Sequence, residues 1–162
     1  MEAQEIFNKL SSQFGEQIIE LREEETLNPT VVVNPAALNS ICSFLHADES
    51  LLFDALMNLA GHDPGPEAEF EVIYHLYSTS HDHYITLKVS TPRETPAVSS
   101  VAELYRTADW HEREAYDMFG IQFDGHPDLK RILLEEDWEG YPLRKDYVPA
   151  EFYRGMRIEK VK

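Results

Sequence analysis

The sequence contains a single cysteine, Cys42, among its 162 residues. No disulfide can form within the chain, and no all-cysteine zinc or iron–sulfur site can be built from this chain alone. The seven glycines are scattered, and they form neither of the spaced glycine motifs that cradle nucleotide phosphates. No serine has the flanking glycines of a nucleophile elbow. The sequence therefore shows no motif for a nucleotide cofactor or for a serine hydrolase.

Long apolar runs are also absent, and the longest is far short of the roughly 20 residues that a membrane-spanning helix needs. The first ten residues are acidic and have no apolar centre, so they do not form a secretory signal. Basic residues are few, since 14 Lys and Arg face 30 Asp and Glu for a formal charge of −16. A phosphate backbone would repel such a chain, which argues against nucleic-acid binding. We expect a soluble protein of a reducing cytoplasm.

The negative charge is unevenly distributed along the chain. Residues 1–106 carry 17 acidic and 5 basic side chains, and residues 107–143 carry 10 acidic and 3 basic ones. Residues 144–162 reverse the balance, with 3 acidic and 6 basic side chains. An acidic body therefore ends in a basic tail, and this asymmetry indicates that the tail has a task different from that of the body.

The hydrophobic pattern predicts a small α+β domain. Helices are expected over residues 6–14, over 35–45 after Asn34, and from about residue 99 to Gly120; strands are expected over 17–21, 30–33, 69–77 and 83–89. Residues 51–61 fit a helix and a strand equally well. The polar residues 78–82 predict an antiparallel hairpin between the last two strands, so the sheet should be mainly antiparallel. Cys42 lies on the apolar face of the second helix and is expected in the core.

Periodicity fades after Gly120, and more than forty residues follow without a long regular element. Such a segment is either disordered or an extended arm that becomes ordered on a partner. Its many large apolar side chains favour the arm, because a free tail would leave them in water. We therefore divide the chain into an α+β body, residues 1–120, and an extended C-terminal docking arm, residues 121–162.

Few residues are candidates for chemistry. His75, His81 and His83 lie close together in the predicted hairpin and define one alternative, a small metal-dependent enzyme. His111 is followed four residues later by Ala115, so the zinc-protease signature fails. The carboxylates of Glu112 and Glu114, and of residues 135–137, are more simply explained as solvated or salt-bridged groups than as acid–base catalysts.

Four segments of the second half carry a resemblance. Residues 112–121 read EREAYDMFGI, and they are followed by GHPDLKRIL at 125–133, EDWEG at 136–140 and PLRKDY at 142–147. Together they closely resemble the signature of the C subunit of NADH–quinone oxidoreductase, the thirty-kilodalton subunit family of respiratory complex I. The resemblance covers about a quarter of the chain, and the upstream α+β pattern agrees with the fold of that family.

The resemblance implies a peripheral-arm subunit on the cytoplasmic side of the bacterial inner membrane, attached to the membrane only through its complex. It implies no cofactor in this chain, with FMN and iron–sulfur clusters in partner subunits that pass electrons from NADH to quinone. The chain alone would be non-catalytic and support assembly of the proton-translocating enzyme. The implied partners are the forty-nine-kilodalton D subunit, which holds the quinone site, and the iron–sulfur subunits B and I.

Nine residues are the candidates for the partner interface: Arg113, Asp117, Phe119, Lys130, Arg131, Trp138, Arg144, Lys145 and Tyr147. Arg113 and Asp117 are expected to hold the signature helix. Two further alternatives stay open. The same family includes subunits of ferredoxin-linked quinone reductases and of membrane-bound hydrogenases, and a stand-alone acidic binding module is also compatible with the composition.

Overall fold

The computed structural model describes residues 1–23 and 28–158 of the chain. It contains three α-helices, α1 (Ala3–Phe14), α2 (Leu38–Ala47) and α3 (Ala108–Phe119), and two short 3₁₀ turns, η1 (Gly15–Gln17) and η2 (Pro35–Ala37). The central sheet is formed by β1 (Ile18–Arg22), β2 (Thr30–Val33), β3 (Ala55–His62), β4 (Phe70–Ser78) and β5 (His83–Thr91). Two small ladders join β6 (Ala97–Ser99) to β7 (Gln122–Asp124) and β8 (Phe152–Tyr153) to β9 (Met156–Arg157).

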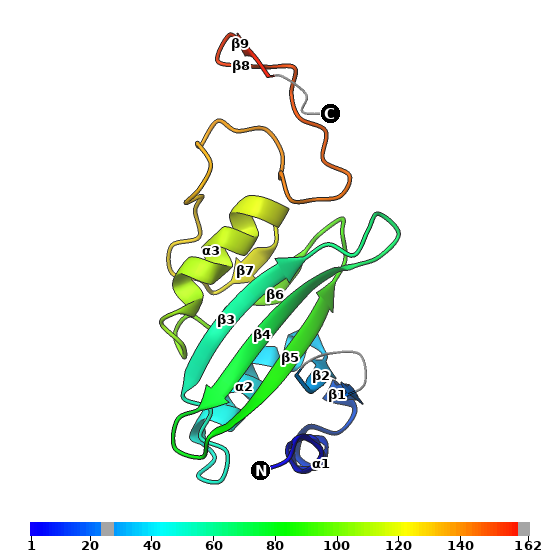
Figure 1. The fold of residues 1–162 in the computed structure, drawn as a ribbon, viewed down its shortest axis with the longest axis vertical. Helices are drawn as coiled ribbons and strands as arrows, with labels where there is room; N and C mark the ends of the chain where they lie inside the picture. The colour runs from blue at the N-terminus through cyan, green and yellow to red at the C-terminus, as the bar shows by residue number, and fades with distance from the viewer. Residues whose placement is uncertain (24–27, 159–162) are drawn as a thin grey trace.

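The five-stranded sheet has the order β1-β2-β5-β4-β3. The β4–β5 hairpin is antiparallel, as the sequence predicts, and β3 extends it by a second antiparallel pairing. Only the β2–β5 pairing in this sheet is parallel. The predicted α+β class with a mainly antiparallel sheet is therefore confirmed (Figure 1).

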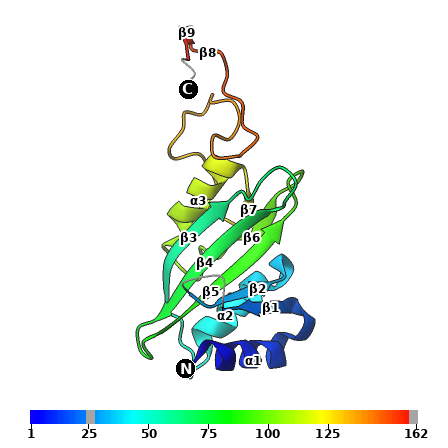
Figure 2. The ribbon, with the colours of Figure 1, turned by 45° about the vertical axis from the view of Figure 1, so that its right-hand side comes forward.

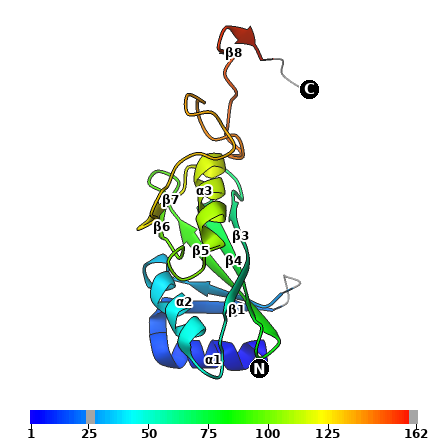
Figure 3. The same ribbon diagram turned by 90° about the vertical axis from the view of Figure 1, so that its left-hand side faces the viewer.

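The helices lie on one face of the sheet (Figure 3). The burial pattern of strand β4 agrees with a sheet that is covered on one face. Every second side chain from Phe70 to Ser78 is buried, and the intervening ones are partly exposed. Cys42 on α2 is fully buried in the core, as expected. Burial raises the pKa of its thiol to about 12, which makes it an inert core residue.

The ambiguous residues 51–61 form a turn followed by the edge strand β3. Helix α3 packs beside this strand and binds its outer backbone groups. The Leu59 N–H donates to Nδ1 of His111 at 3.0 Å, and the Thr107 hydroxyl donates to the Leu56 carbonyl at 3.1 Å. An exposed edge strand is a template for aggregation, and α3 covers part of this one. The strand assignment depends on the antiparallel pairing with β4, from Ala55–Tyr77 to His62–Glu71.

The predicted start of the third helix near residue 99 is wrong. Residues 97–99 form β6, which pairs in parallel with β7, and α3 begins only at Ala108. The pairing joins segments on the two sides of α3, so local periodicity does not reveal it. Apolar residues such as Val98 and Val101 are buried here through the strand and the turn that follows it.

The first residues after Gly120 belong to the core of the body. Ile121 is fully buried and Phe123 is 2% exposed, and both lie in or next to β7. Beyond β7 the chain runs without helix or sheet along one end of the body as far as Tyr147, and then extends outward to the β8–β9 hairpin (Figure 2). This hairpin lies at the opposite end of the molecule from α1. Residues 159–162 of the predicted arm lie outside the described part.

Gly120 ends helix α3 in the left-handed conformation, with φ +73° and its N–H bonded to the Tyr116 carbonyl. A Cβ at this position would lie 2.6 Å from the Tyr141 ring and 2.7 Å from Nη2 of Arg144. The glycine therefore permits both the helix end and the close approach of the chain that returns over it.

We expect Gly120→Ala to lower the free energy of unfolding by about 3 kcal/mol, through left-handed strain and overlap with the returning chain. Gly125→Ala is the matched control, because Gly125 has φ +84° but no heavy atom would lie within 4 Å of a Cβ added there. It should cost only the backbone strain, about 1 kcal/mol. Urea unfolding of both variants measures the difference, and equal losses would contradict the packing argument.

Candidate functional site

Among the described residues of the body, three carboxylates are buried: Asp63 is 2% exposed, and Glu112 and Asp117 are fully buried. A buried carboxylate costs free energy unless hydrogen bonds replace its lost water. Asp63 and Asp117 find several of these bonds in residues 125–147, which we call the anchored segment. These two carboxylates attach the anchored segment to the body.

Asp117 on α3 binds the start of the anchored segment. Its Oδ2 accepts three successive backbone N–H groups, from Ile132 at 3.0 Å, Leu133 at 2.7 Å and Leu134 at 3.0 Å. Its Oδ1 pairs with Nη1 of Arg131 at 2.9 Å. Burial raises the pKa of Asp117, but the three backbone donors and Arg131 together lower it by more than burial raises it. The pKa of Asp117 therefore lies below its usual range.

Arg131 also binds the middle of the anchored segment. Besides Asp117, its guanidinium donates to the carbonyls of Trp138 at 3.4 Å and Gly140 at 3.2 Å. It also lies 5.3 Å from the centre of the Tyr141 ring. One planar cation thus fixes the loop from residue 131 to residue 141, a task for which the five N–H donors of arginine are suited.

Arg144 closes the segment over the end of α3. Its Nε donates to the Phe119 carbonyl at 2.6 Å, one of the carbonyls that a helix end leaves without a partner. Its guanidinium lies 4.8 Å from the Phe70 ring centre and 4.6 Å from that of Tyr141. The side chain therefore serves as a helix cap and a cation–π contact at once.

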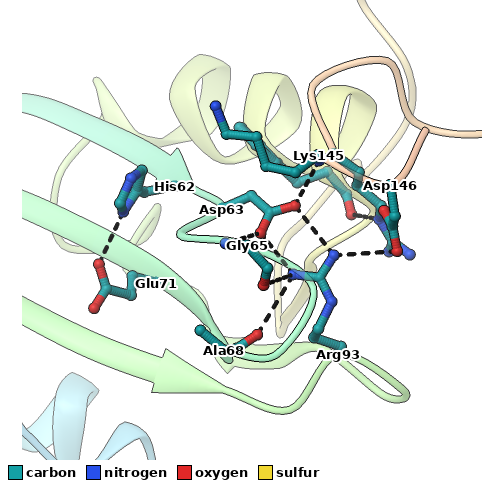
Figure 4. Close-up of polar contacts among 10 residues, drawn as sticks. His62, Asp63, Gly65, Ala68, Glu71, Arg93, Lys145 and Asp146 are labelled. Atoms are coloured by element: carbon teal, nitrogen blue, oxygen red, sulfur yellow. Dashed lines mark hydrogen bonds and ion pairs between the residues drawn. The ribbon is translucent and has the colours of Figure 1, made fainter.

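Asp63, at the end of β3, holds the last part of the anchored segment (Figure 4). Its two oxygens pair with the fork of Arg93 at 2.6 and 3.1 Å, and Oδ2 also accepts the Lys145 N–H at 2.8 Å. Arg93 in turn contacts Asp146 at 3.2 Å. The hydrogen bonds from Arg93, followed by those from the Lys145 and Gly65 backbone, lower the pKa of Asp63 to about 2 despite its burial.

Glu112 binds hydrogen-bond donors of the body. It accepts the Ser100 hydroxyl at 2.6 Å and the Val101 N–H at 2.7 Å, which fixes the turn after β6. Burial raises the pKa of this carboxyl. Of the two alternatives expected for Glu112, the solvated one is wrong because the side chain is fully buried, whereas Nε2 of His126 lies within salt-bridge distance of its Oε2, at 3.9 Å. The His126 side chain is also fully buried, and its Nε2 lies 3.2 Å from Oδ1 of Asp109.

The nine predicted interface residues fall into two groups. Five of them bond to other parts of the chain: Arg113, Asp117, Phe119, Arg131 and Arg144. Arg113 is one of these because its Nε donates to the Lys130 carbonyl at 3.3 Å. The other four leave side-chain surface at the segment's edge: Lys130, Trp138, Lys145 and Tyr147. Their role toward a partner stays a prediction, whereas the first group has a visible structural task within the chain.

The histidines of the β4–β5 hairpin do not converge on a common point. The imidazole Nε2 atoms of His81 and His83 each bond to a backbone carbonyl, at 2.9 and 2.8 Å, and the two rings stack at 5.5 Å. Within residues 1–23 and 28–158, no three His, Cys, Asp or Glu side chains are grouped so that they could hold a metal ion. The geometry therefore gives the metal-dependent alternative no support.

Beyond Tyr147 the chain exposes apolar side chains. Val148 is 77%, Phe152 57% and Met156 65% exposed. We call residues 148–158 the outer arm. Its contacts with residues 135–138 include the Arg154–Asp137 pair at 2.9 Å, in which both side chains are more than half exposed. Apolar groups presented in this way are typical of an interaction surface.

The sequence did not reveal Asp63 and Arg93 as site residues. Asp63 stands in a Pro- and Gly-rich loop, and Arg93 in a segment between two prolines, so both look like ordinary loop residues. Their partners are 30 and 82 residues apart in sequence. The only local signal is the bond from the Gly65 N–H to Asp63 at 2.9 Å, a turn that aspartate commonly stabilises.

A sequence profile described as "Respiratory-chain NADH dehydrogenase, 30 Kd subunit" matches residues 31–153. This stretch includes the central sheet except β1 and the first residue of β2, and also α3, the anchored segment and the start of the outer arm. The chain belongs to this 30 kDa subunit family. The resemblance seen in the signature segments is thereby confirmed.

Relatives agree with membership of the 30 kDa subunit family. The NADH-quinone oxidoreductase C subunit of Chloroherpeton thalassium is 42% identical over 153 residues, which are 94% of this chain and 63% of that protein. The C subunit of Roseiflexus castenholzii is 50% identical over 118 residues, 72% of this chain and 68% of that one. For Chlorobium phaeobacteroides the identity is 38%, over 94% of this chain and 92% of that one. The chain thus spans less than two thirds of the first of these relatives.

Solved structures share the fold. The trypsin-resistant fragment of Nqo5 superposes with a TM-score of 0.63 at 28% identity, over 79% of this chain and 100% of that one. A chain of the membrane-bound sulfane sulfur reductase, an archaeal respiratory membrane complex, gives a TM-score of 0.74 at 20% identity, over 91% and 86%. The second likeness shows the fold alone. In the described part of our chain, no helix has the length and apolar character to cross a membrane.

We expect Asp117→Asn to lower the free energy of unfolding by about 3 kcal/mol, because it leaves Arg131 without its buried partner. Trypsin should then cleave after Arg131 faster, since the anchored segment opens. Asp128→Asn is the control, because the Asp128–Lys130 pair has both side chains about 60% exposed and should change stability little. Unchanged cleavage in Asp117→Asn would contradict the anchoring role.

Asp63 should make the free energy of unfolding depend on pH. Its pKa is about 2 in the folded protein against an ordinary 3.8, so it stabilises the fold above pH 4 by about 2 kcal/mol. This contribution is lost as pH falls toward 2. Urea unfolding of wild type and Asp63→Asn should therefore differ by about this amount at pH 7 and converge below pH 4. Asp124→Asn, at an exposed site, is the control, and a difference constant with pH would refute the assignment.

Proposed function

We propose that this chain is a non-catalytic peripheral-arm subunit of a proton-translocating NADH–quinone oxidoreductase. The observation that carries the proposal is the family match over 31–153, together with an outer arm that presents apolar side chains to solvent. The buried carboxylates Asp63, Glu112 and Asp117 all have structural partners within the chain. The chain would support assembly, while FMN and iron–sulfur clusters of partner subunits carry electrons from NADH to quinone.

The proposed partners are the forty-nine-kilodalton quinone-site subunit and the iron–sulfur subunits B and I, on the cytoplasmic side of the inner membrane. The anchored segment would hold the start of the outer arm at a defined place on the body before docking, which lowers the entropy lost on binding. The solved relative is a trypsin-resistant fragment, which supports a compact body preceding a more accessible C-terminal part.

A second candidate keeps the same role in a different complex. The fold recurs in the archaeal sulfane sulfur reductase, a respiratory membrane complex. A ferredoxin-linked quinone reductase or a membrane-bound hydrogenase could therefore use a subunit of this kind. The electron donor of the purified complex distinguishes these candidates, since only the first oxidises NADH.

Truncation after Tyr147 tests the proposal. The variant keeps Asp63, Asp117 and the whole anchored segment, so its free energy of unfolding should stay within about 1 kcal/mol of wild type. It should no longer co-purify with the forty-nine-kilodalton subunit, and NADH–quinone activity of the membranes should fall accordingly. The full-length chain expressed in the same strain is the control. Full incorporation of the truncated chain would show that the outer arm is not needed for docking.

A further inference from the structure

A cavity of about 260 Å³ lies between residues 137–139 of the anchored segment and the outer arm. Its walls include four aromatic side chains: Trp138, Tyr147, Phe152 and Tyr153. The volume admits one aliphatic side chain and part of its backbone. Aromatic walls of this kind are characteristic of pockets that receive an anchoring side chain from another protein.

Contacts within the chain preform the cavity. The Trp138 and Tyr153 rings lie 5.1 Å apart, and the Tyr153 hydroxyl donates to Oδ1 of Asp137 at 2.9 Å. Both oxygens of Asp137 also bond to the Arg154 guanidinium at 2.9 Å. Trp138 Nε1 is buried and has no acceptor among the described residues. An indole N–H in this situation usually has a hydrogen-bond partner.

The charge around the cavity is negative. Among the described residues of the lining, Asp137 and Glu139 are acidic and Arg154 is basic, and Arg154 is already paired with Asp137. Glu139 lines the cavity and is exposed. An occupant with a negative charge would be repelled here, whereas a lysine or arginine next to an apolar anchor would be attracted.

We propose that the cavity receives an extended segment of a partner subunit that inserts one aliphatic side chain beside a lysine or arginine. The inference rests on the proposed function, because the occupant is supplied by the complex, and it adds the chemistry of the partner surface.

Site-specific cross-linking in the assembled complex tests this. Phe152, at the cavity wall and 57% exposed, is replaced by the photoreactive p-benzoylphenylalanine, which conserves the aromatic ring. After irradiation, we expect one cross-linked peptide of another subunit, with a lysine or arginine next to aliphatic residues. The same replacement at Tyr84, 52% exposed on β5, is the control and should not give this peptide.

A cross-link that stays within this chain, or that reaches a partner peptide without a basic residue, would overturn the inference while the complex remains assembled. The proposed function fails differently, since the wild-type chain would then be missing from the complex altogether.

A charge reversal provides the second readout. Glu139→Lys should reduce the amount of this chain in the purified complex by about ten-fold, since it places a cation against a cationic segment. Glu103→Lys makes the same change at an exposed site before α3 and should leave the amount unchanged. Equal incorporation of the two variants would show that the occupant is not cationic.

Discussion

The buried carboxylate of Asp117 determines how the second half of this chain folds. Removed from water, it requires hydrogen-bond donors for its oxygens. Three successive N–H groups of residues 132–134 and the guanidinium of Arg131 satisfy it. The chain after β7 must therefore return to the helix, and this return brings Arg144 to the helix end and Lys145 to Asp63. Charge burial therefore helps to set the path of this segment without helix or sheet, together with the packing of Leu129 and Leu134 against the core.

Burial divides the predicted arm into two parts with different stability. The anchored segment is held by carboxylates that are almost inaccessible to water, whose loss costs several kcal/mol. The outer arm is held by exposed pairs such as Asp137–Arg154, which contribute little and are screened by salt. A rigid base therefore carries a weakly held end that exposes apolar side chains. This arrangement suits a subunit that must fold alone and dock afterwards, because the end can change its contacts without cost to the body.

Much of the fold could be predicted from local pattern. The helices over 6–14 and 35–45, the strands over 30–33 and the β4–β5 hairpin all follow from periodicity, and Cys42 was correctly expected in the core. Residues 51–61 stayed open between helix and strand, and pairing with β4 decides for the strand. The helix expected from about residue 99 was wrong, because residues 97–99 pair with β7 on the far side of α3. The signature residues were recognised as a set, but Asp63 and Arg93 were not, since their roles arise from contacts across 30 and 82 residues.

The sequence by itself determined the family, the α+β class, the acidic body and the basic end, because motif, period and composition are local properties. Only the tertiary structure decided which charges act inside the protein. In the sequence, Arg131 and Arg144 resemble ordinary surface cations, but in the structure they bind Asp117 and the end of α3. Lys145 instead donates its backbone N–H to Asp63, and the residue is exposed to solvent. The physical reason is that the free energy of a charge depends on its burial and its partners, and both are set by the path of the whole chain.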